Sequence, residues 1–222
     1  MRIAGYAKTS FVDYPGEIAC VVFTAGCNMR CAYCHNKHIL AGDIPLKSQK
    51  ELFAYLTKRR DVLQAVVVTG GEPTLQDGLA DFLRSVKELG YHTKLDTNGT
   101  NPLTLKALAE GGLLDYIAMD VKAPLYKYGE TAGVPVNLNA ITASIDFIKH
   151  SGIAYEFRTT FAPSLGTEDV CAIGGLVKGA RAYYLQQYRQ VSGQPPPHDA
   201  ATILEAACKL RALAGVCEVR GL

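Results

Sequence analysis

The feature that most restricts the fold of this chain is the alternation of short apolar runs with longer segments of helical spacing. Six runs are almost continuously apolar and end near Gly, Pro, Asn or Asp, as strands do. Parallel strands that are covered on both faces have this composition. The predicted strands are Ala19–Thr24, Ala65–Thr69, His92–Asp96, Tyr116–Asp120, Tyr155–Thr159 and Ala182–Gln186.

Helices are predicted between these strands, with Ser48 and Thr167 as N-caps and Pro102 in a first helical turn. Their ranges are Ser48–Arg59, Gly78–Leu89, Pro102–Gly111, Asn137–Lys149, Thr167–Val177 and Ala200–Leu213. Repeated strand–helix units predict an α/β fold with a curved parallel sheet and outer helices, as in an incomplete (β/α)6 barrel. A flat doubly wound sheet has the same alternation, so periodicity alone does not distinguish the two.

Two stretches near the carboxyl terminus depart from the alternation. Residues 191–198 are rich in Gly and Pro and predict an exposed loop before the last helix. Residues 216–220 fit either a final short strand or a packed tail.

Size and charge exclude several classes of protein. With 222 residues, 48% of them hydrophobic, the chain is expected to form a single domain over residues 1–222. The net charge of +2 is spread along the sequence, which does not favour nucleic acid as a partner. No apolar run approaches the roughly 18 residues of a membrane span, and the amino terminus has no secretory signal pattern. We therefore expect a cytoplasmic protein.

Three cysteines lie within eight positions directly after the first predicted strand. Cys27, Cys31 and Cys34 have Cys-x3-Cys-x2-Cys spacing, which lets three thiolates converge on one centre. Structural zinc usually takes four ligands with paired Cys-x2-Cys spacing. A cubane iron–sulfur cluster on three cysteines keeps one iron without a protein ligand, and that iron is a reaction site. The spacing therefore favours a [4Fe–4S] cluster.

The remaining cysteines leave alternatives open. His35 or Cys20 can complete a zinc site in place of the cluster. Cys20 lies inside a predicted strand, where a cysteine is typically a small buried hydrophobe. The other three have no mutual ligand spacing, so packing is the simplest interpretation and an auxiliary cluster the alternative; they are Cys171, Cys208 and Cys217.

The cysteine stretch resembles the radical S-adenosylmethionine (SAM) superfamily, in which an aromatic residue, here Tyr33, precedes the third cysteine. In that family SAM chelates the open iron, and reductive cleavage of SAM yields a 5′-deoxyadenosyl radical. After the second strand, Gly70, Gly71 and Glu72 resemble the family's GGE motif, which binds the SAM ammonium group. Glycines allow close backbone approach, and a carboxylate accepts hydrogen bonds from a cation. His35 and Asn36 are expected to shape the SAM pocket.

Two further strand ends resemble elements of the glycyl radical enzyme activases within this superfamily. The third strand ends in a DTNG element, Asp96 to Gly99, and the fourth in the D-x-K element Asp120-Val121-Lys122. The resemblance implies that the second element contacts SAM. It also implies a monovalent cation, for which oxygen ligands are suitable. The residues expected at that cation are Asp96, Thr97, Ala118 and Asp120, with Asn98 and Val121 as further cofactor contacts.

The last strands bring more polar side chains to the same rim, where barrel folds place their chemistry. In the activases a side chain near the end of the fifth strand contacts SAM; here the candidates are Arg158, Thr159 and Thr160. Gln186 ends the sixth strand and is a further candidate. Asp13, in the Pro-Gly turn region of the amino-terminal segment, either contacts a substrate peptide or belongs only to the turn.

The resemblance extends from Ile3 to Gly221 and is strongest to the activating proteins of anaerobic ribonucleoside-triphosphate reductase. It implies an oxidoreductase that removes a Cα hydrogen from a glycine of a partner enzyme. Between Asn36 and Ser48 there is no room for an accessory ferredoxin domain, so flavodoxin or ferredoxin is the expected electron donor. The alternative is a radical SAM enzyme acting on a nucleobase-like or pterin compound.

Overall fold

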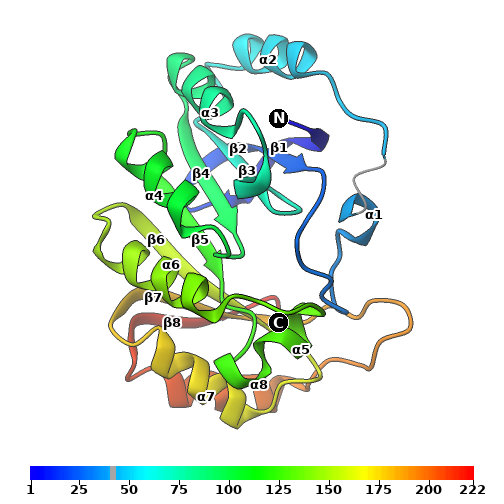
Figure 1. Ribbon diagram of the computed structural model, residues 1–222, viewed down its shortest axis with the longest axis vertical. Coiled ribbons are helices and arrows are strands. Elements are labelled where there is room, and N and C mark those ends of the chain that lie inside the picture. Colours follow the sequence, from blue (N-terminus) through cyan, green and yellow to red (C-terminus); the bar gives the residue numbers. More distant parts are fainter. Residues whose placement is uncertain (41–43) are drawn as a thin grey trace. The chain divides into compact units, whose positions relative to one another are not determined.

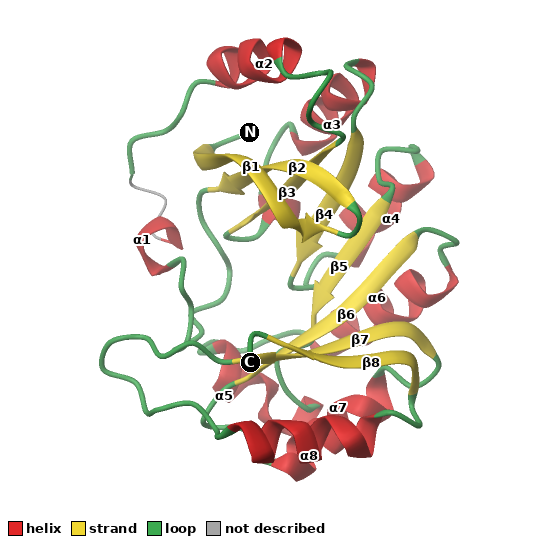
Figure 2. Cartoon of the chain, turned by 180° about the vertical axis from the view of Figure 1, so that it is seen from behind, coloured by secondary structure: helices red, strands yellow, loops and turns green. Residues whose placement is uncertain are grey.

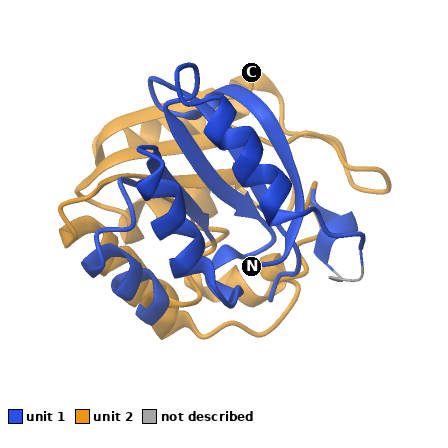
Figure 3. Cartoon of the chain, turned by 90° about the horizontal axis from the view of Figure 1, so that it is seen from above, with its two compact units in different colours: residues 1–28, 36–97, 103–117 blue, residues 29–35, 98–102, 118–222 orange. Residues whose placement is uncertain are grey.

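The structure is a computed structural model that describes residues 1–40 and 44–222. It confirms an α/β fold of mostly parallel strands with surrounding helices (Figures 1 and 2). The chain forms two compact units, residues 1–28, 36–97 and 103–117 in the first and residues 29–35, 98–102 and 118–222 in the second (Figure 3). The expectation of a single domain stays a prediction.

The first unit is built on a hairpin and a parallel sheet. Strand β1 (Ile3–Tyr14) pairs antiparallel with β2 (Glu17–Thr24), which continues in parallel with β3 (Ala65–Gly70) and β4 (His92–Thr97). Val66 to Val68 are fully buried, as expected of a strand covered on both faces. The helices of this unit are α1 (Lys37–Leu40), α2 (Gln49–Lys58), η1 (Pro73–Leu75), α3 (Leu79–Glu88) and α4 (Pro102–Glu110), whose first residue belongs to the second unit.

The second unit carries the remaining parallel strands. These are β6 (Ala154–Phe161), β7 (Ala180–Gln187) and β8 (Ala214–Arg220), paired in that order. Strand β5 (Tyr116–Asp120) contributes its last three residues to this unit. The helices are η2 (Leu125–Lys127), α5 (Tyr128–Ala132), α6 (Leu138–His150), α7 (Thr167–Leu176) and α8 (Ala200–Leu210).

Helix ends confirm two of the sequence predictions and correct a third. Ser48 caps α2 by accepting a hydrogen bond from the backbone of Glu51, and Pro102 is the first residue of α4. The expectation that Thr167 is the N-cap of α7 is wrong, because Gly166 occupies that position. The backbone N–H of Gly166 donates to the Asp169 carboxylate at 2.8 Å, so this carboxylate fixes the helix start. Of the two alternatives for residues 216–220, the structure shows the strand, which is part of β8.

A half-buried ion pair anchors α3 to the edge of β4. Lys87 Nζ lies 2.8 and 2.7 Å from the two carboxylate oxygens of Asp115, and the Thr93 backbone N–H donates to the same carboxylate at 2.7 Å. Burial alone raises the pKa of the Asp115 carboxyl, but Lys87 and Thr93 outweigh it and hold that pKa below its usual value.

This shift predicts a pH-dependent contribution to stability. A carboxyl whose folded-state pKa lies below the unfolded value of about 3.9 stabilises the protein fully above that value and loses its contribution as pH falls through the folded pKa. We expect Asp115→Asn to be less stable than wild type at pH 7, with the gap closing below about pH 4. Urea unfolding from pH 7 to 3 measures it. Asp81→Asn, which alters an exposed pair with Arg84, is the control. A gap that stays constant with pH contradicts this account.

Candidate active site

The two ends of the cysteine loop are tied to the turn that follows β3. Gly26 precedes Cys27, and its carbonyl accepts a hydrogen bond from the Glu72 N–H at 2.9 Å. Asn36 closes the loop, and its side-chain amide donates to the Gly70 carbonyl at 3.0 Å. The Gly-Gly-Glu turn therefore holds the base of the cysteine loop at the carboxyl ends of β2 and β3.

The two glycines of this turn are required by a contact between backbones. An added Cβ at Gly71 would lie 1.9 Å from the Gly26 carbonyl oxygen. Gly70 has φ +109°, and its Cβ would lie 2.5 Å from the Thr24 nitrogen. The sequence suggested that these glycines admit a ligand. The structure adds a different reason for them, which is close packing against the strand end that leads to Cys27.

Glu72 is fully buried, and its carboxylate joins two strand ends. Its Oε1 accepts hydrogen bonds from the Thr74 N–H at 3.1 Å, the Thr74 hydroxyl at 2.6 Å and the Thr97 hydroxyl at 2.7 Å. Charge-assisted bonds of this kind are strong, so Glu72 fixes η1 against the end of β4. Its predicted contact with the SAM ammonium group stays a prediction.

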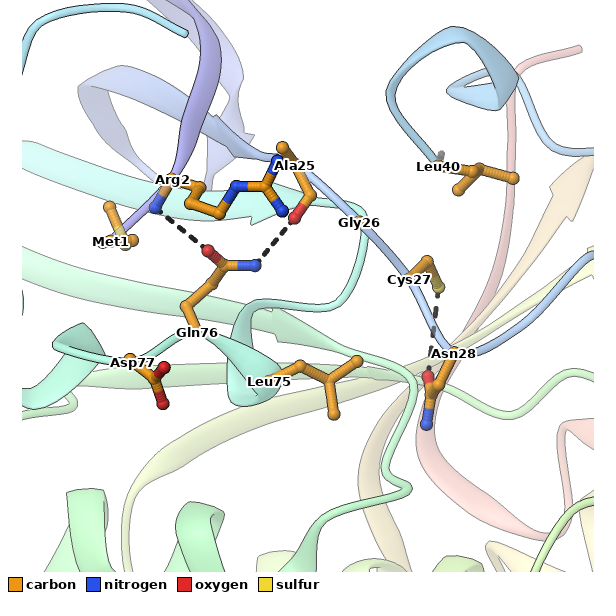
Figure 4. Close-up of a pocket in the computed structure, with 10 residues that line it drawn as sticks. All are labelled: Met1, Arg2, Ala25, Gly26, Cys27, Asn28, Leu40, Leu75, Gln76 and Asp77. Atoms are coloured by element: carbon orange, nitrogen blue, oxygen red, sulfur yellow. Dashed lines mark hydrogen bonds between the residues drawn. The ribbon is translucent and has the colours of Figure 1, made fainter. Parts of the chain in front are cut away.

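Cys27 lines a pocket of about 520 Å³ on the first unit (Figure 4). In this pocket the Gln76 side chain bridges two strand ends: its carbonyl accepts from the Arg2 N–H at 3.0 Å, and its amide donates to the Ala25 carbonyl at 2.8 Å. These bonds hold the backbone immediately before Cys27. Cys27 is half-buried and is one of the residues that line this pocket.

The other two cysteines of the motif lie in the second unit. The Cys34 N–H donates to the Cys31 carbonyl at 3.1 Å, which closes a tight turn around Tyr33. The Arg30 N–H donates to the Ala132 carbonyl at 2.7 Å and so anchors this turn to α5. Cys31 is buried and Cys34 half-buried, whereas His35 is exposed.

Asp120 and Lys122 form a charged cluster with Arg158 near this turn. Asp120 receives Arg158 Nε on one oxygen at 2.8 Å and Lys122 Nζ on the other at 2.9 Å. Burial alone raises the pKa of the Asp120 carboxyl, but the charges of Arg158 and Lys122 outweigh it and hold that pKa well below its usual range. Burial likewise lowers the pKa of Lys122, and Asp120 reverses this shift. Both groups are therefore charged at neutral pH.

The other residues predicted to contact the cofactor differ in their burial. The Thr159 hydroxyl donates to the Val121 carbonyl at 2.7 Å and is buried, whereas Thr160 is half-buried and lies on the same side of β6 as Arg158. Gln186 is half-buried and pairs in register with Thr160. Asn98 is buried and accepts from the Thr100 N–H and hydroxyl, as in an Asx turn.

Sequence reasoning missed two residues that support this cluster. The Glu156 carboxylate, 1% exposed, receives Arg220 on both oxygens at 2.9 and 2.8 Å and lies 3.8 Å from Arg158. The Arg220 guanidinium lies over the Tyr184 ring at 3.3 Å. Glu156 and Arg158 are two positions apart and therefore lie on the same face of β6. Two charged residues on one face of a buried strand are the sequence signal that indicates such a network.

Removing the central charge of this network is expected to be costly. Glu156→Gln leaves Arg220 and Arg158 without their shared carboxylate, which predicts a loss of about 3–5 kcal/mol in the free energy of unfolding. Glu205→Gln is the matched control, because Glu205 forms an exposed pair with Lys209 and is expected to cost less than about 0.5 kcal/mol. Urea unfolding of both variants measures the difference. Equal losses contradict a structural role for Glu156.

The donor set fits a [4Fe–4S] cluster and SAM. All seven cysteines are free thiols, so Cys27, Cys31 and Cys34 are available as ligands. The Tyr33 hydroxyl is buried and has no hydrogen-bond partner among the described residues. Its pKa is raised by burial and by the charges of Cys31 and Asp120, while Lys122 opposes the shift. A buried polar atom of this kind is suited to a polar ligand beside the cysteine turn.

The fold and the site define a class: an α/β protein with a three-cysteine loop at the carboxyl ends of its parallel strands. The model of the Radical SAM superfamily matches residues 21–174, and the chain belongs to this superfamily. Membership implies a [4Fe–4S] cluster and SAM as cofactors.

Particular relatives narrow this class. A protein of Methanocaldococcus jannaschii, named as a candidate glycyl-radical enzyme activating enzyme, is 37% identical over 84% of this chain and 79% of its own length. The 7-carboxy-7-deazaguanine synthase of Koribacter versatilis is 31% identical over 71% and 67%. The crystal structure of Streptococcus suis SuiB with its precursor peptide SuiA matches with a TM-score of 0.69 at 17% identity, covering 90% of this chain and 48% of that one. The last similarity concerns the fold alone. The superfamily match and the similarity to the M. jannaschii protein indicate an enzyme of the activating type.

Proposed function

We propose that this enzyme generates a glycyl radical on a partner protein, as expected for an activase of an anaerobic ribonucleotide reductase-like enzyme. The observation that carries the proposal is the similarity to the M. jannaschii protein, which extends over most of both chains. The short connection from Asn36 to Ser48 is consistent with a compact activase.

The cysteine loop supplies the cluster ligands in this proposal. Cys27, Cys31 and Cys34 hold three irons, and the loop is kept in place by the bonds of Gly26 and Asn36 to the Gly-Gly-Glu turn. When bound, the reduced cluster and SAM supply the 5′-deoxyadenosyl radical that removes a Cα hydrogen from the target glycine. The protein itself needs no acid or base for that step, because its contribution is binding and orientation.

Charged and polar residues at the strand ends bind SAM in this proposal. Lys122 and Asp120 offer a cation and an anion held in fixed positions by their mutual pairing and by Arg158. Tyr33 contributes a buried hydroxyl beside them. The Gly70–Glu72 turn supplies backbone and carboxylate groups on the first unit. Pre-organised charges of this kind orient a ligand without a further ordering cost.

An external reductant and a reducing compartment complete the proposal. The electron comes from flavodoxin or ferredoxin, since the activity requires a low-potential donor. A cytoplasmic location fits free, partly exposed cysteines, which oxidising compartments convert to disulfides. Among the described residues, no helix is long and apolar enough to cross a membrane.

Anaerobic reconstitution tests the chemistry. Iron and sulfide should give roughly four irons per chain. Reduction in the presence of SAM should then release methionine and 5′-deoxyadenosine in equal amounts, measured by liquid chromatography. A fully loaded, reduced protein that leaves SAM intact contradicts the proposal.

The similarity to 7-carboxy-7-deazaguanine synthase makes a small-molecule substrate the second candidate. It covers less of this chain at lower identity than the similarity to the activating enzyme. Incubation with a glycyl radical enzyme and, separately, with pterin and purine-like compounds distinguishes the two functions. A glycyl radical supports the activase, and consumption of a small molecule without any protein radical supports the alternative.

A further inference from the structure

A lysine ammonium is buried inside the sheet of the first unit. The side chain of Lys94 is only 2% exposed and points to the same face of the sheet as Val67, its partner in register on β3. That face carries an apolar cluster of Tyr14, Ala19, Val21, Ala65 and Val67. A buried charge requires compensating partners.

The partners of Lys94 include a residue expected to bind a metal ion. Its Nζ lies 2.9 Å from Asp96 Oδ1, donates to the Asp13 carbonyl at 2.6 Å and lies 5.7 Å from the centre of the Tyr116 ring. Asp96 is one of the two carboxylates for which the activase resemblance implies a monovalent cation. A positive charge is therefore already bound at this carboxylate.

The second carboxylate of the expected cation site is also compensated within its own unit. Asp120 pairs with both Arg158 and Lys122. A potassium or sodium ion at either carboxylate would have to share it with a fixed positive charge, and like charges a few ångströms apart repel strongly when buried.

We propose that the Lys94 ammonium replaces the monovalent cation at Asp96, so that SAM binding by this protein is independent of potassium and sodium. Lys94 is a positioning residue in this proposal: it holds Asp96 and the Asp13 backbone through its charge, and it does not touch SAM. The expected effect on SAM binding rests on the proposed function, whereas the expected effect on the stability of the protein does not.

The test uses the reconstituted holoenzyme in potassium chloride and in tetramethylammonium chloride at equal ionic strength. Equilibrium dialysis with labelled SAM gives the affinity, and the thermal unfolding midpoint gives the stability. For wild type we expect dissociation constants within about twofold in the two salts and equal midpoints. For Lys94→Met we expect SAM affinity at least about tenfold weaker in tetramethylammonium than in potassium, with a midpoint that rises on adding potassium.

Lys87→Met is the matched control. Lys87 also pairs with an aspartate in the first unit, Asp115, but that carboxylate is not an expected cation ligand. Loss of the Lys87 ammonium should lower the thermal midpoint equally in both salts. The proposal is overturned if wild type needs potassium for SAM affinity, or if Lys94→Met responds to potassium no more than Lys87→Met does.

Two further arms keep the outcomes separate. If Lys94→Met does not fold, Lys94→Arg, which retains the charge, is used in its place. The comparison of wild type in the two salts then decides whether a cation is required. If wild type binds no SAM in either salt, the proposed function fails, while the potassium dependence of the thermal midpoints of wild type and Lys94→Met still supports or overturns the role of Lys94.

Discussion

Replacing Gly71 with alanine is expected to lower the free energy of unfolding by at least about 3 kcal/mol, because the new Cβ meets backbone and not a flexible side chain. It would lie 1.9 Å from the Gly26 carbonyl oxygen and 2.6 Å from its carbon. Relief requires moving the turn away from Gly26, which breaks the 2.9 Å bond from the Glu72 N–H. The same movement releases the base of the cysteine loop, so iron incorporation should fall as well.

Urea unfolding and iron content after reconstitution measure the two effects. Gly5→Ala is the matched control, since Gly5 lies in β1 of the same unit and a Cβ there meets nothing within 4 Å. Its stability should stay within about 1 kcal/mol of wild type, with full iron loading. Wild-type stability and iron content in Gly71→Ala contradict the tight packing described for this turn.

Loss of Cys27 is expected to abolish SAM cleavage. A cubane cluster held by three thiolates loses one of its protein ligands in Cys27→Ala, so the reconstituted variant should lack the roughly four irons of the wild type. Release of 5′-deoxyadenosine should then fall to background. Iron analysis, the absorbance of the cluster and chromatography of the products measure these changes.

Cys20→Ala separates the ligand role from a general effect of removing a cysteine. Cys20 is fully buried in β2, and burial raises the pKa of its thiol to about 12, so it is protonated at neutral pH. We expect this variant to lose about 1–2 kcal/mol of stability through the small cavity, yet to keep its cluster and SAM cleavage. Cleavage retained by Cys27→Ala contradicts the cluster assignment.

The strands could be predicted from the sequence because their signal is local. The run Ala65 to Thr69, for example, is apolar up to its last residue and is followed by glycine. Short helices carry no such signal. Helix α5 has only five residues, too few to show a period. It is fixed instead by Gly133, whose φ of +69° ends the helix, and by the bond from Arg30 to Ala132.

The candidate site residues were found in the sequence for the same reason, and their roles stay predictions. The cysteines and the Gly-Gly-Glu and D-x-K elements are contiguous, so their spacing indicates their chemistry. The partners of Lys94 and Glu156 are not local: Lys94 donates to a carbonyl 81 positions away, and Glu156 pairs with an arginine 64 positions away. Long-range pairs of this kind depend on strand register, which one sequence does not reveal.

The most direct test of the activase function is electron paramagnetic resonance of a partner protein. The reconstituted, reduced enzyme is incubated with SAM and a glycyl radical enzyme such as anaerobic ribonucleotide reductase, in which glycine carries deuterium at Cα. We expect a glycyl radical signal on the partner and deuterium in the released 5′-deoxyadenosine, with both absent for Cys27→Ala. Cleavage of SAM with no signal and no deuterium transfer for any glycyl radical enzyme tested contradicts it.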